Sequence, residues 1–379
     1  MNKDIKVAFL IPYLSNGGAE KALFNVANFF YNNQVTVQII TASNKFADNM
    51  NRLPPGIKLY CFNRAAPLDS PSFLKNTKQL IKYARAEKPD VLICNSDYLN
   101  IAAIMARFFI KKKFKIIISQ QFHAGEFLKT LPFKNRLFLT CLQYIVARNA
   151  NVVACSSKGV AANYAGLYGI PYPSAKIKSI YNPIYEEAIP NLASQPVTDV
   201  DFGGDKIKLI TVGRLLEQKA QATLIQAFAL FVKEVPHAHL YIIGIGKELE
   251  ALEGLSQKLE VKNQVSFLGF KENPFAYIAK CDLFVLSSKY EGFGNVIVEA
   301  LATGVNVVST NCPSGPAEIL NDGEFGYLCA VGDPLALCQT MIRALQHKKP
   351  AQLLINRAKD FSIERTAKEY MDTVFETVD

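Results

Sequence analysis

The sequence predicts an α/β protein built from two parallel-sheet domains. Short apolar runs alternate with amphipathic helical segments along the chain, a rhythm typical of parallel strands joined by right-handed crossovers. At 379 residues the chain is too long for one ordinary hydrophobic core. A polar stretch rich in Gly, Pro, Ser and Asp at 191–206 interrupts the alternation, which then starts again.

The first half contains five expected strands and one clear helix. Apolar runs at 5–13 and 35–41 flank an amphipathic helical pattern at 19–32. The remaining runs are short and continuously apolar, as in strands buried on both faces of a sheet, and lie at 90–96, 115–121 and 151–157.

The second half repeats this rhythm after the polar stretch. Its expected strands lie at 207–215, 239–246, 264–270, 282–288 and 306–311, with helical patterns between them. We therefore predict an N-terminal domain at 1–187 and a C-terminal domain at 188–360. The near-helical spacing of apolar residues at 361–379 predicts a final helix.

Composition points to a cytoplasmic protein. No apolar run approaches the roughly 20 residues of a membrane span, and the N-terminus reads as a first strand without a signal-peptide cleavage site. The eight cysteines are scattered without CxxC spacing, several of them in apolar runs. This pattern favours buried thiols over disulfides or a zinc site, and we expect no metal.

Charge divides unevenly between the halves. Residues 1–190 contain 24 Lys+Arg against 10 Asp+Glu, giving +14, and the remainder contain 18 against 23, giving −5. The densest basic cluster, 106–115, interleaves phenylalanines with Arg107, Lys111, Lys112, Lys113 and Lys115. An anionic membrane surface and a solvated face at a helix C-terminus both remain open as explanations. Nucleic acid is disfavoured because no recognised binding motif accompanies the charge.

A first candidate site follows the first strand. Gly17 and Gly18 stand between that strand and the helix at 19–32. Paired glycines allow close backbone approach, and a helix N-terminus presents free N–H groups to an anion or a polar ligand. A plain tight turn is the alternative.

A second candidate follows the strand at 207–215. In the segment "TVGRLLEQKA", Gly213 and Arg214 lie at the carboxyl end of this strand, and Lys219 comes five residues after Arg214. Ligands of open parallel sheets bind at that end, where two cations can clamp a diphosphate. A pair of surface salt bridges is the alternative.

A third candidate is "KYEGFGN", between the strand at 282–288 and a helix starting near Asn295. The N–H groups of Phe293, Gly294 and Asn295 suit phosphate oxygens. Glu299, about one turn into the helix, can accept ribose hydroxyls, and Glu291 before it can hold hydroxyls of a second sugar. The alternative is an ordinary helical glutamate and a favourable N-terminal charge.

Taken together, Gly213-Arg214, Lys219 and Glu291-x7-Glu299 resemble the motifs of the retaining glycosyltransferases of family 4. The resemblance runs the length of the chain, through "YIIGIGKELE", "QVSFLGF" and "STNCPSGPAEILNDGEFGYL" in the expected order. It implies the GT-B fold, in which two Rossmann-like domains face a central cleft, with the last helix crossing back to the first domain.

The resemblance also implies roles. Arg214 and Lys219 would bind the donor diphosphate, Glu299 the ribose, and Glu291 the transferred sugar. His123, in "SQQFHAGEF", would face the sugar and the acceptor. The remaining nucleotide-sugar contacts would come from Gly17, Gly18, Gly269, Phe270, Gly292, Phe293, Gly294, Asn295 and Val296.

Two positions depart from the family pattern. Ala220 replaces a common glycine, and Asn306 replaces the proline of a common Gly-x-Pro. Neither removes a polar group with an implied role, so we expect activity to be retained.

The implied activity is metal-independent front-face transfer of a hexose or N-acetylhexosamine from a UDP-sugar. The expected acceptor is a lipid-linked oligosaccharide or a lipopolysaccharide or capsule precursor at the inner face of the membrane. A non-catalytic nucleotide-sugar-binding protein and a nucleotide-sugar 2-epimerase remain alternatives. A Rossmann dehydrogenase is disfavoured because "GIGKELE" supplies only the first glycine pair of its fingerprint.

Overall fold

The computed structural model describes residues 5–14, 17–43, 53–62, 73–111 and 113–378. They form two compact α/β units, which confirms the predicted fold class. The first unit comprises residues up to Pro183 together with Ile363–Asp379, and the second comprises Ile184–Ser362.

The first unit is built on a seven-stranded parallel sheet with strand order β3-β2-β1-β4-β5-β6-β7. Its strands are β1 (Lys6–Ile11), β2 (Thr36–Thr41), β3 (Lys58–Cys61), β4 (Val91–Cys94), β5 (Lys115–Gln120), β6 (Val152–Cys155) and β7 (Ile177–Ser179). Its helices are α1 (Gly18–Asn32), α2 (Phe73–Glu87), α3 (Asp97–Phe108), α4 (Ala124–Lys129), α5 (Phe133–Asn149), α6 (Lys158–Tyr168) and α15 (Ile363–Val378).

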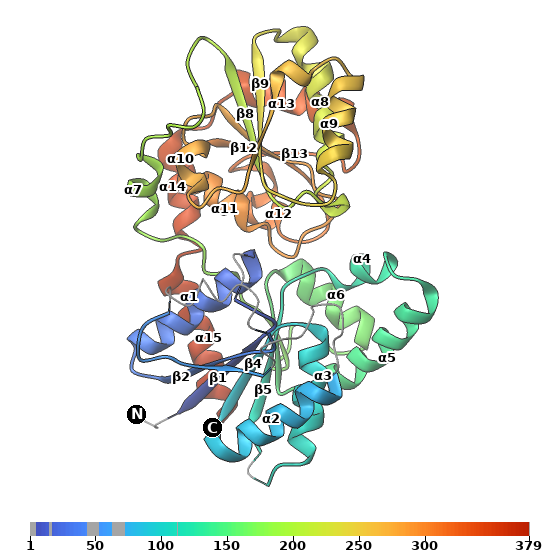
Figure 1. The fold of residues 1–379 in the computed structure, drawn as a ribbon, viewed down its shortest axis with the longest axis vertical. Helices are drawn as coiled ribbons and strands as arrows, with labels where there is room; N and C mark the ends of the chain where they lie inside the picture. The colour runs from blue at the N-terminus through green and yellow to red at the C-terminus, as the bar shows by residue number, and fades with distance from the viewer. Residues whose placement is uncertain (1–4, 15–16, 44–52, 63–72, 112, 379) are drawn as a thin grey trace. The chain divides into compact units, whose positions relative to one another are not determined.

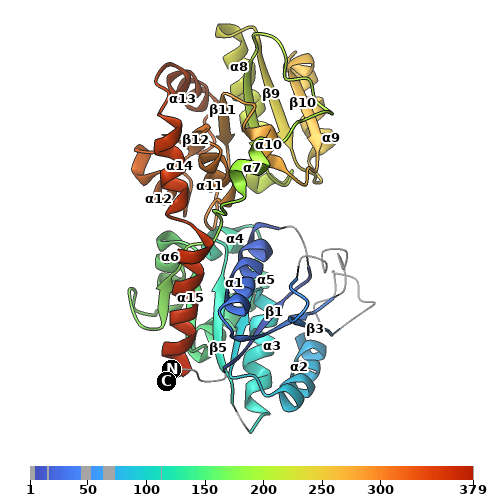
Figure 2. The same ribbon diagram turned by 90° about the vertical axis from the view of Figure 1, so that its left-hand side faces the viewer.

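Helices cover both faces of this sheet. On one face α1 and α15 pack over the strands, with Phe30 and Tyr370 fully buried in the same hydrophobic cluster (Figure 2). The hydroxyls of Tyr370 and Ser119 lie 3.1 Å apart, so the last helix is also tied to β5. On the other face α2, α3, α5 and α6 enclose a second cluster. Burial on both faces explains why these strands read as continuous apolar runs.

The second unit has a six-stranded parallel sheet with order β10-β9-β8-β11-β12-β13. Its strands are β8 (Ile207–Val212), β9 (Ala238–Ile243), β10 (Val265–Gly269), β11 (Leu283–Leu286), β12 (Asn306–Thr310) and β13 (Tyr327–Cys329). Its helices are α7 (Ile189–Ala193), α8 (Gln221–Glu234), α9 (Leu249–Lys258), α10 (Pro274–Ile278), α11 (Asn295–Ala302), α12 (Pro316–Ile319), α13 (Pro334–Gln346) and α14 (Ala351–Lys359), with short 3-10 turns η2 (Glu217–Lys219), η3 (Lys262–Gln264) and η4 (Asn321–Gly323).

Helices α8, α9 and α13 pack against one face of this sheet, and Figure 1 shows α10, α11 and α14 on the other side. In chain order the second sheet runs 3-2-1-4-5-6, which is the Rossmann order, and the first sheet has the same order with a seventh strand added at its end. In such sheets ligands bind where the order reverses, beyond the carboxyl ends of strands 1 and 4. In the second unit these are β8 and β11, the strands that precede the second and third candidate segments.

None of the helices in the described part of the chain is long and apolar enough to cross a bilayer.

Candidate functional site

The second unit brings together the loops that follow β8 and β11. Lys219 ends the 3-10 turn after β8, and Glu291 lies in the loop after β11. The Lys219 Nζ lies 2.6 Å from Glu291 Oε1, and their side chains are only 15% and 7% exposed. Two residues that lie 72 positions apart in the sequence therefore form a buried ion pair at the switch point of the sheet.

Further hydrogen bonds hold this pair in place. Ser288 Oγ donates to Glu291 Oε1 at 2.6 Å, and Thr310 Oγ1 donates to the Ser288 carbonyl at 2.7 Å. Ser287 Oγ donates to the Lys219 carbonyl at 2.9 Å. Sequence reasoning missed these three hydroxyls. The available signal was the pair of small polar residues at the end of an otherwise apolar strand.

Only one oxygen of Glu291 is used by this network. Both hydrogen bonds to its carboxylate end on Oε1, so Oε2 accepts none from the described residues. A carboxylate that is held by one oxygen and uncommitted at the other can accept hydroxyl hydrogen bonds from a ligand. The three donors of the Lys219 ammonium likewise allow it to hold Glu291 and an anion together.

Arg214 lies five residues before Lys219 and is exposed, and no acidic side chain pairs with it among the described residues. Its carbonyl accepts a hydrogen bond from the Gln221 side chain at 3.0 Å, which fixes the backbone of the loop. The guanidinium is thus available to a diphosphate.

The turn before α11 has a tightly packed backbone. Gly294 is the residue before the helix and has a φ of 96°, a conformation that favours glycine. Gly315, with a φ of 93°, packs so closely that an added Cβ would lie 1.8 Å from the Phe293 carbonyl oxygen. Gly292, Phe293 and Gly294 are buried, whereas Asn295, Val296 and Glu299 on α11 are partly exposed. Glu299 follows Asn295 by four residues, so the two lie on one side of the helix.

Glycines also gather at the carboxyl ends of β8, β9 and β10. A Cβ on Gly244 would lie 1.9 Å from the Gly213 carbonyl oxygen, and the Gly244 N–H donates to the Gly269 carbonyl at 2.8 Å. Phe270, which follows β10, is 52% exposed. Gly269 and Phe270, which were predicted to contact the nucleotide-sugar, therefore lie at the same edge of the sheet as Arg214 and Lys219.

Only one of the two departures from the family pattern has a local explanation. Ala220 has a φ of 48° and a ψ of 42°, a left-handed conformation in which glycine is the usual residue. Asn306 begins β12, and its side chain bonds both the N–H and the carbonyl of Lys349, at 2.8 and 3.2 Å. The amide thereby ties this strand to the segment before α14, a bond that proline could not make.

Burial raises the pKa of the Cys312 thiol to about 12, and the nearby Glu291 carboxylate adds to this shift. This cysteine beside the ion pair therefore stays protonated and is a poor nucleophile.

Three of the predicted residues belong to the first unit. Gly17 precedes α1 with a φ of −65°, and Gly18 is the first residue of that helix. His123 precedes α4, and its Nδ1 accepts a hydrogen bond from the Glu126 N–H at 3.1 Å. His123 therefore caps a helix, which is a structural role. Burial lowers its pKa, partly offset by Glu126, so the ring is neutral near pH 7 with its proton on Nε2.

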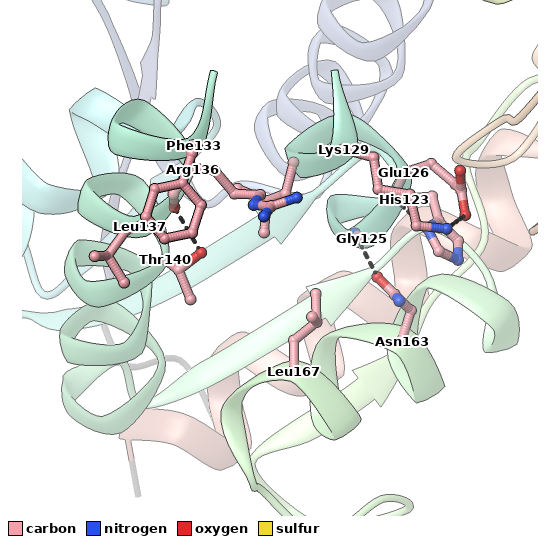
Figure 3. Close-up of a pocket in the computed structure, with 11 residues that line it drawn as sticks. His123, Gly125, Glu126, Lys129, Phe133, Arg136, Leu137, Thr140, Asn163 and Leu167 are labelled. Atoms are coloured by element: carbon pink, nitrogen blue, oxygen red, sulfur yellow. Dashed lines mark hydrogen bonds and ion pairs between the residues drawn. The ribbon is translucent and has the colours of Figure 1, made fainter. Parts of the chain in front are cut away.

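His123 also lines a pocket of about 420 Å³ between α4, α5 and α6 (Figure 3). Figure 3 shows Asn163 of α6 pointing to Gly125 of α4, a 3.0 Å hydrogen bond that holds the two helices together.

The basic cluster at 106–115 is only partly available to a ligand. The Arg107 guanidinium bonds the Asn149 carbonyl and the Asn151 side chain, so it fastens α3 to the end of α5. Lys111 and Lys113 are exposed and Lys115 is partly exposed, whereas Lys112 lies outside the described residues.

Comparison with known proteins agrees with this arrangement. Residues 16–187 match the family model described as Glycosyltransferase Family 4, and residues 198–361 match the model described as Glycosyl transferases group 1.

Two relatives come from Campylobacter jejuni. One is named N-acetylgalactosamine-N,N'-diacetylbacillosaminyl-diphospho-undecaprenol 4-alpha-N-acetylgalactosaminyltransferase. It is 28% identical over 93% of this chain and 94% of its own length. The other is an alpha-1,4-N-acetyl-D-galactosaminyltransferase named for a GalNAc-containing diphospho-undecaprenol acceptor. It is 26% identical over 98% of this chain and 99% of its own length.

Among solved structures, Anabaena Alr3699/HepE in complex with UDP and glucose superposes with a TM-score of 0.81. That chain is 21% identical, with 98% of this chain and all of that one covered. The two family models, the relatives and the two Rossmann-order sheets lead to one conclusion. The chain belongs to the family-4 type of glycosyltransferases with the GT-B fold.

Proposed function

We propose that the protein is a retaining, metal-independent glycosyltransferase that moves a hexose or N-acetylhexosamine from a UDP-sugar to a lipid-linked glycan acceptor. The observation that carries this proposal is the buried Lys219–Glu291 pair, in which one carboxylate oxygen is anchored and the other is uncommitted.

The cations suit the leaving group. Negative charge grows on the donor diphosphate as its bond to the sugar breaks, and cations positioned in advance stabilise that charge. Arg214 and Lys219 supply two of them at the carboxyl end of β8, and the N-terminus of α11 adds positive potential. These groups can neutralise a diphosphate without a metal ion.

Glu291 Oε2 would accept hydroxyls of the transferred sugar, and Glu299 those of the ribose. The acceptor hydroxyl attacks the anomeric carbon from the side that the diphosphate leaves. A new carbon–oxygen bond replaces the bond to the phosphate oxygen, which takes the hydroxyl proton. Retention of the anomeric configuration follows from attack on that face.

Both substrates are supported by relatives. A structure of similar fold was determined with UDP and glucose, and two relatives are named for diphospho-undecaprenol-linked acceptors. Exposed Lys111 and Lys113, with Lys115, would favour an anionic membrane surface where such acceptors reside. On this basis we propose that the protein acts at the inner face of the membrane.

The test is a transfer reaction with UDP-GalNAc, UDP-GlcNAc, UDP-Glc and UDP-Gal and a diphospho-undecaprenol-linked glycan, in buffer with EDTA. NMR of the product should show the same α configuration as the donor. A β-linked product, or transfer that requires added Mg²⁺ or Mn²⁺, would contradict the mechanism. Interconversion of UDP-sugars without transfer would favour the epimerase, and binding without turnover the non-catalytic protein.

A further inference from the structure

Helix α5 has an apolar face that no part of the described chain covers. Phe133, Leu137 and Tyr144 form one stripe, and Phe138 and Ile145 form the next; all five are between 47% and 68% exposed. The opposite side of the helix, with Leu139 and Val146, is buried in the first unit. The helix is therefore apolar on two opposite faces, unlike an ordinary surface helix, whose outer face is polar.

The charged side chains of α5 all have one sign. The sequence of α5, "FKNRLFLTCLQYIVARN", contains Lys134, Arg136 and Arg148 and no acidic residue. The Arg136 and Arg148 guanidinium carbons lie 5.6 and 5.1 Å from the ring centres of Phe133 and Tyr144. Cations placed beside exposed aromatic rings are typical of helices that lie in the headgroup region of an anionic bilayer.

Charge also argues against a second copy of this chain as the occupant. A two-fold contact through α5 would bring the same face of both helices together. Because the helix carries only positive side chains, that contact would place cations opposite cations in a partly desolvated interface. An anionic lipid surface meets the same charges with the opposite sign.

We propose that the α5 face, defined by Phe133, Leu137, Phe138, Tyr144 and Ile145, docks on an anionic lipid bilayer. The helix is about 25 Å long and lies along the surface instead of crossing it. Figure 1 shows α5 at the outer edge of the first unit. This inference rests on the proposed function in one respect, that the acceptor is anchored in a membrane.

Docking through α5 has a consequence for the pocket in Figure 3. Phe133, Leu137 and Arg136 line that pocket together with His123. Arg136 reaches from α5 into the space beside α4 in this view. A bilayer against α5 would therefore bring lipid headgroups to the opening beside His123. This is where an acceptor carried by a lipid would need to arrive.

The absence of tryptophan from the chain permits a direct test. A Phe138→Trp variant of the full chain carries a single fluorophore on the α5 face. With vesicles of phosphatidylcholine and phosphatidylglycerol we expect a blue shift of its emission and quenching by brominated acyl chains. Leu335→Trp, at a position in the second unit that is 56% exposed, is the matched control and should show neither change.

A second variant tests affinity. Replacing both Phe138 and Ile145 by Ser should weaken flotation with these vesicles by at least about tenfold, because two large side chains lose their burial. The matched pair Leu335→Ser and Leu353→Ser, which are 56% and 40% exposed in the second unit, should float like the wild type. Stabilisation by UDP, which reports on the donor site, should be unchanged in both. A wild type that UDP fails to stabilise would contradict the proposed function and leave the docking result standing.

Three results would overturn the docking proposal. One is an emission spectrum of Phe138→Trp that does not shift when vesicles are added. This includes the case in which Phe109→Trp, in the adjoining basic cluster, shows a shift and Phe138→Trp does not. Another is equal binding to vesicles of phosphatidylcholine only. The third is a wild-type dimer in solution that the Ser variant makes monomeric, which would assign the face to a second copy of the chain.

Discussion

Replacing Glu291 by Gln should destabilise the second unit, because it leaves a positive charge buried without its partner. The Lys219 side chain is 15% exposed, and its only acidic partner in the described chain is Glu291. Removing one member of a buried ion pair costs about 3–5 kcal/mol. The glutamine amide would keep an acceptor for Ser288, and Lys219 retains some solvent contact, so we expect the lower end, about 3 kcal/mol.

The expected change in melting temperature follows from the size of the unit. For a folding unit of 150–250 residues each kcal/mol shifts Tm by roughly 2–4 °C, so Glu291→Gln should lower Tm by about 6–12 °C. Adding Lys219→Met to Glu291→Gln removes the unpaired buried charge. The double variant should therefore recover at least about half of the lost Tm. Calorimetry of wild type, both single variants and the double variant completes a double-mutant cycle.

Lys289→Met is the matched control, because Lys289 pairs at 2.8 Å with Glu217 while both side chains are largely exposed. Its Tm should change by no more than about 2 °C. Additive effects of Lys219→Met and Glu291→Gln, or a Glu291→Gln variant as stable as the control, would refute the buried-pair interpretation.

Three further predictions concern His123, Asp97 and Gly244. His123→Asn preserves a side-chain acceptor for the Glu126 N–H and should keep stability, whereas His123→Ala should lose about 1 kcal/mol. If His123 acts only as a cap, the Asn variant will transfer sugar at the wild-type rate. A large loss of kcat at unchanged Tm would instead show that His123 contacts the substrates. Burial raises the pKa of Asp97 to about 7 from its usual 3.8, and none of the described residues that line its cavity is cationic. The folded protein therefore holds a proton that the unfolded chain releases above about pH 4, and the free energy of unfolding should fall as pH rises from 4 to 7. The full pKa shift equals about 4 kcal/mol of unfolding free energy. Because Asp97 is partly exposed, we expect the wild type to lose about half of this amount. The loss should be absent from Asp97→Asn when both proteins are unfolded in urea at pH 5 and 8. Finally, Gly244→Ala should displace the Gly213 loop and weaken UDP binding at least about tenfold, since about 1.4 kcal/mol of strain suffices. Gly254→Ala, in α9 with open space around its Cα, should bind UDP normally and unfold at a slightly higher temperature.

The larger elements could be predicted because their periodicity is strong. The apolar runs at 90–96 and 115–121 became β4 and β5, and the pattern at 19–32 became α1. Strands β3, β7 and β13 were not predicted. Each has only three or four residues, and most of their side chains are not fully buried, so no continuous apolar run marks them.

The ion pair at the site could not be derived from the residues alone. Lys219 and Glu291 meet because β8 and β11 are neighbours in the sheet, and strand order is set by tertiary packing that spacing does not encode. Motif resemblance put both residues at the donor, but neither the motif nor the spacing predicted their direct contact or the Ser288 hydrogen bond. The general expectation of buried thiols is wrong for Cys141, which is exposed on α5.

The UDP-sugar site is best tested by thermal unfolding of the wild type and Glu299→Ala, each with and without UDP. Ligand at about 100 times its dissociation constant should stabilise the wild type by about 2.7 kcal/mol, and UDP should do so where GDP and NAD do not. Glu299→Ala should melt like the wild type without ligand and lose most of the UDP-dependent shift. Equal stabilisation of both proteins by UDP, or stabilisation of the wild type by NAD alone, would contradict a UDP-sugar site built on Glu299, Lys219 and Glu291.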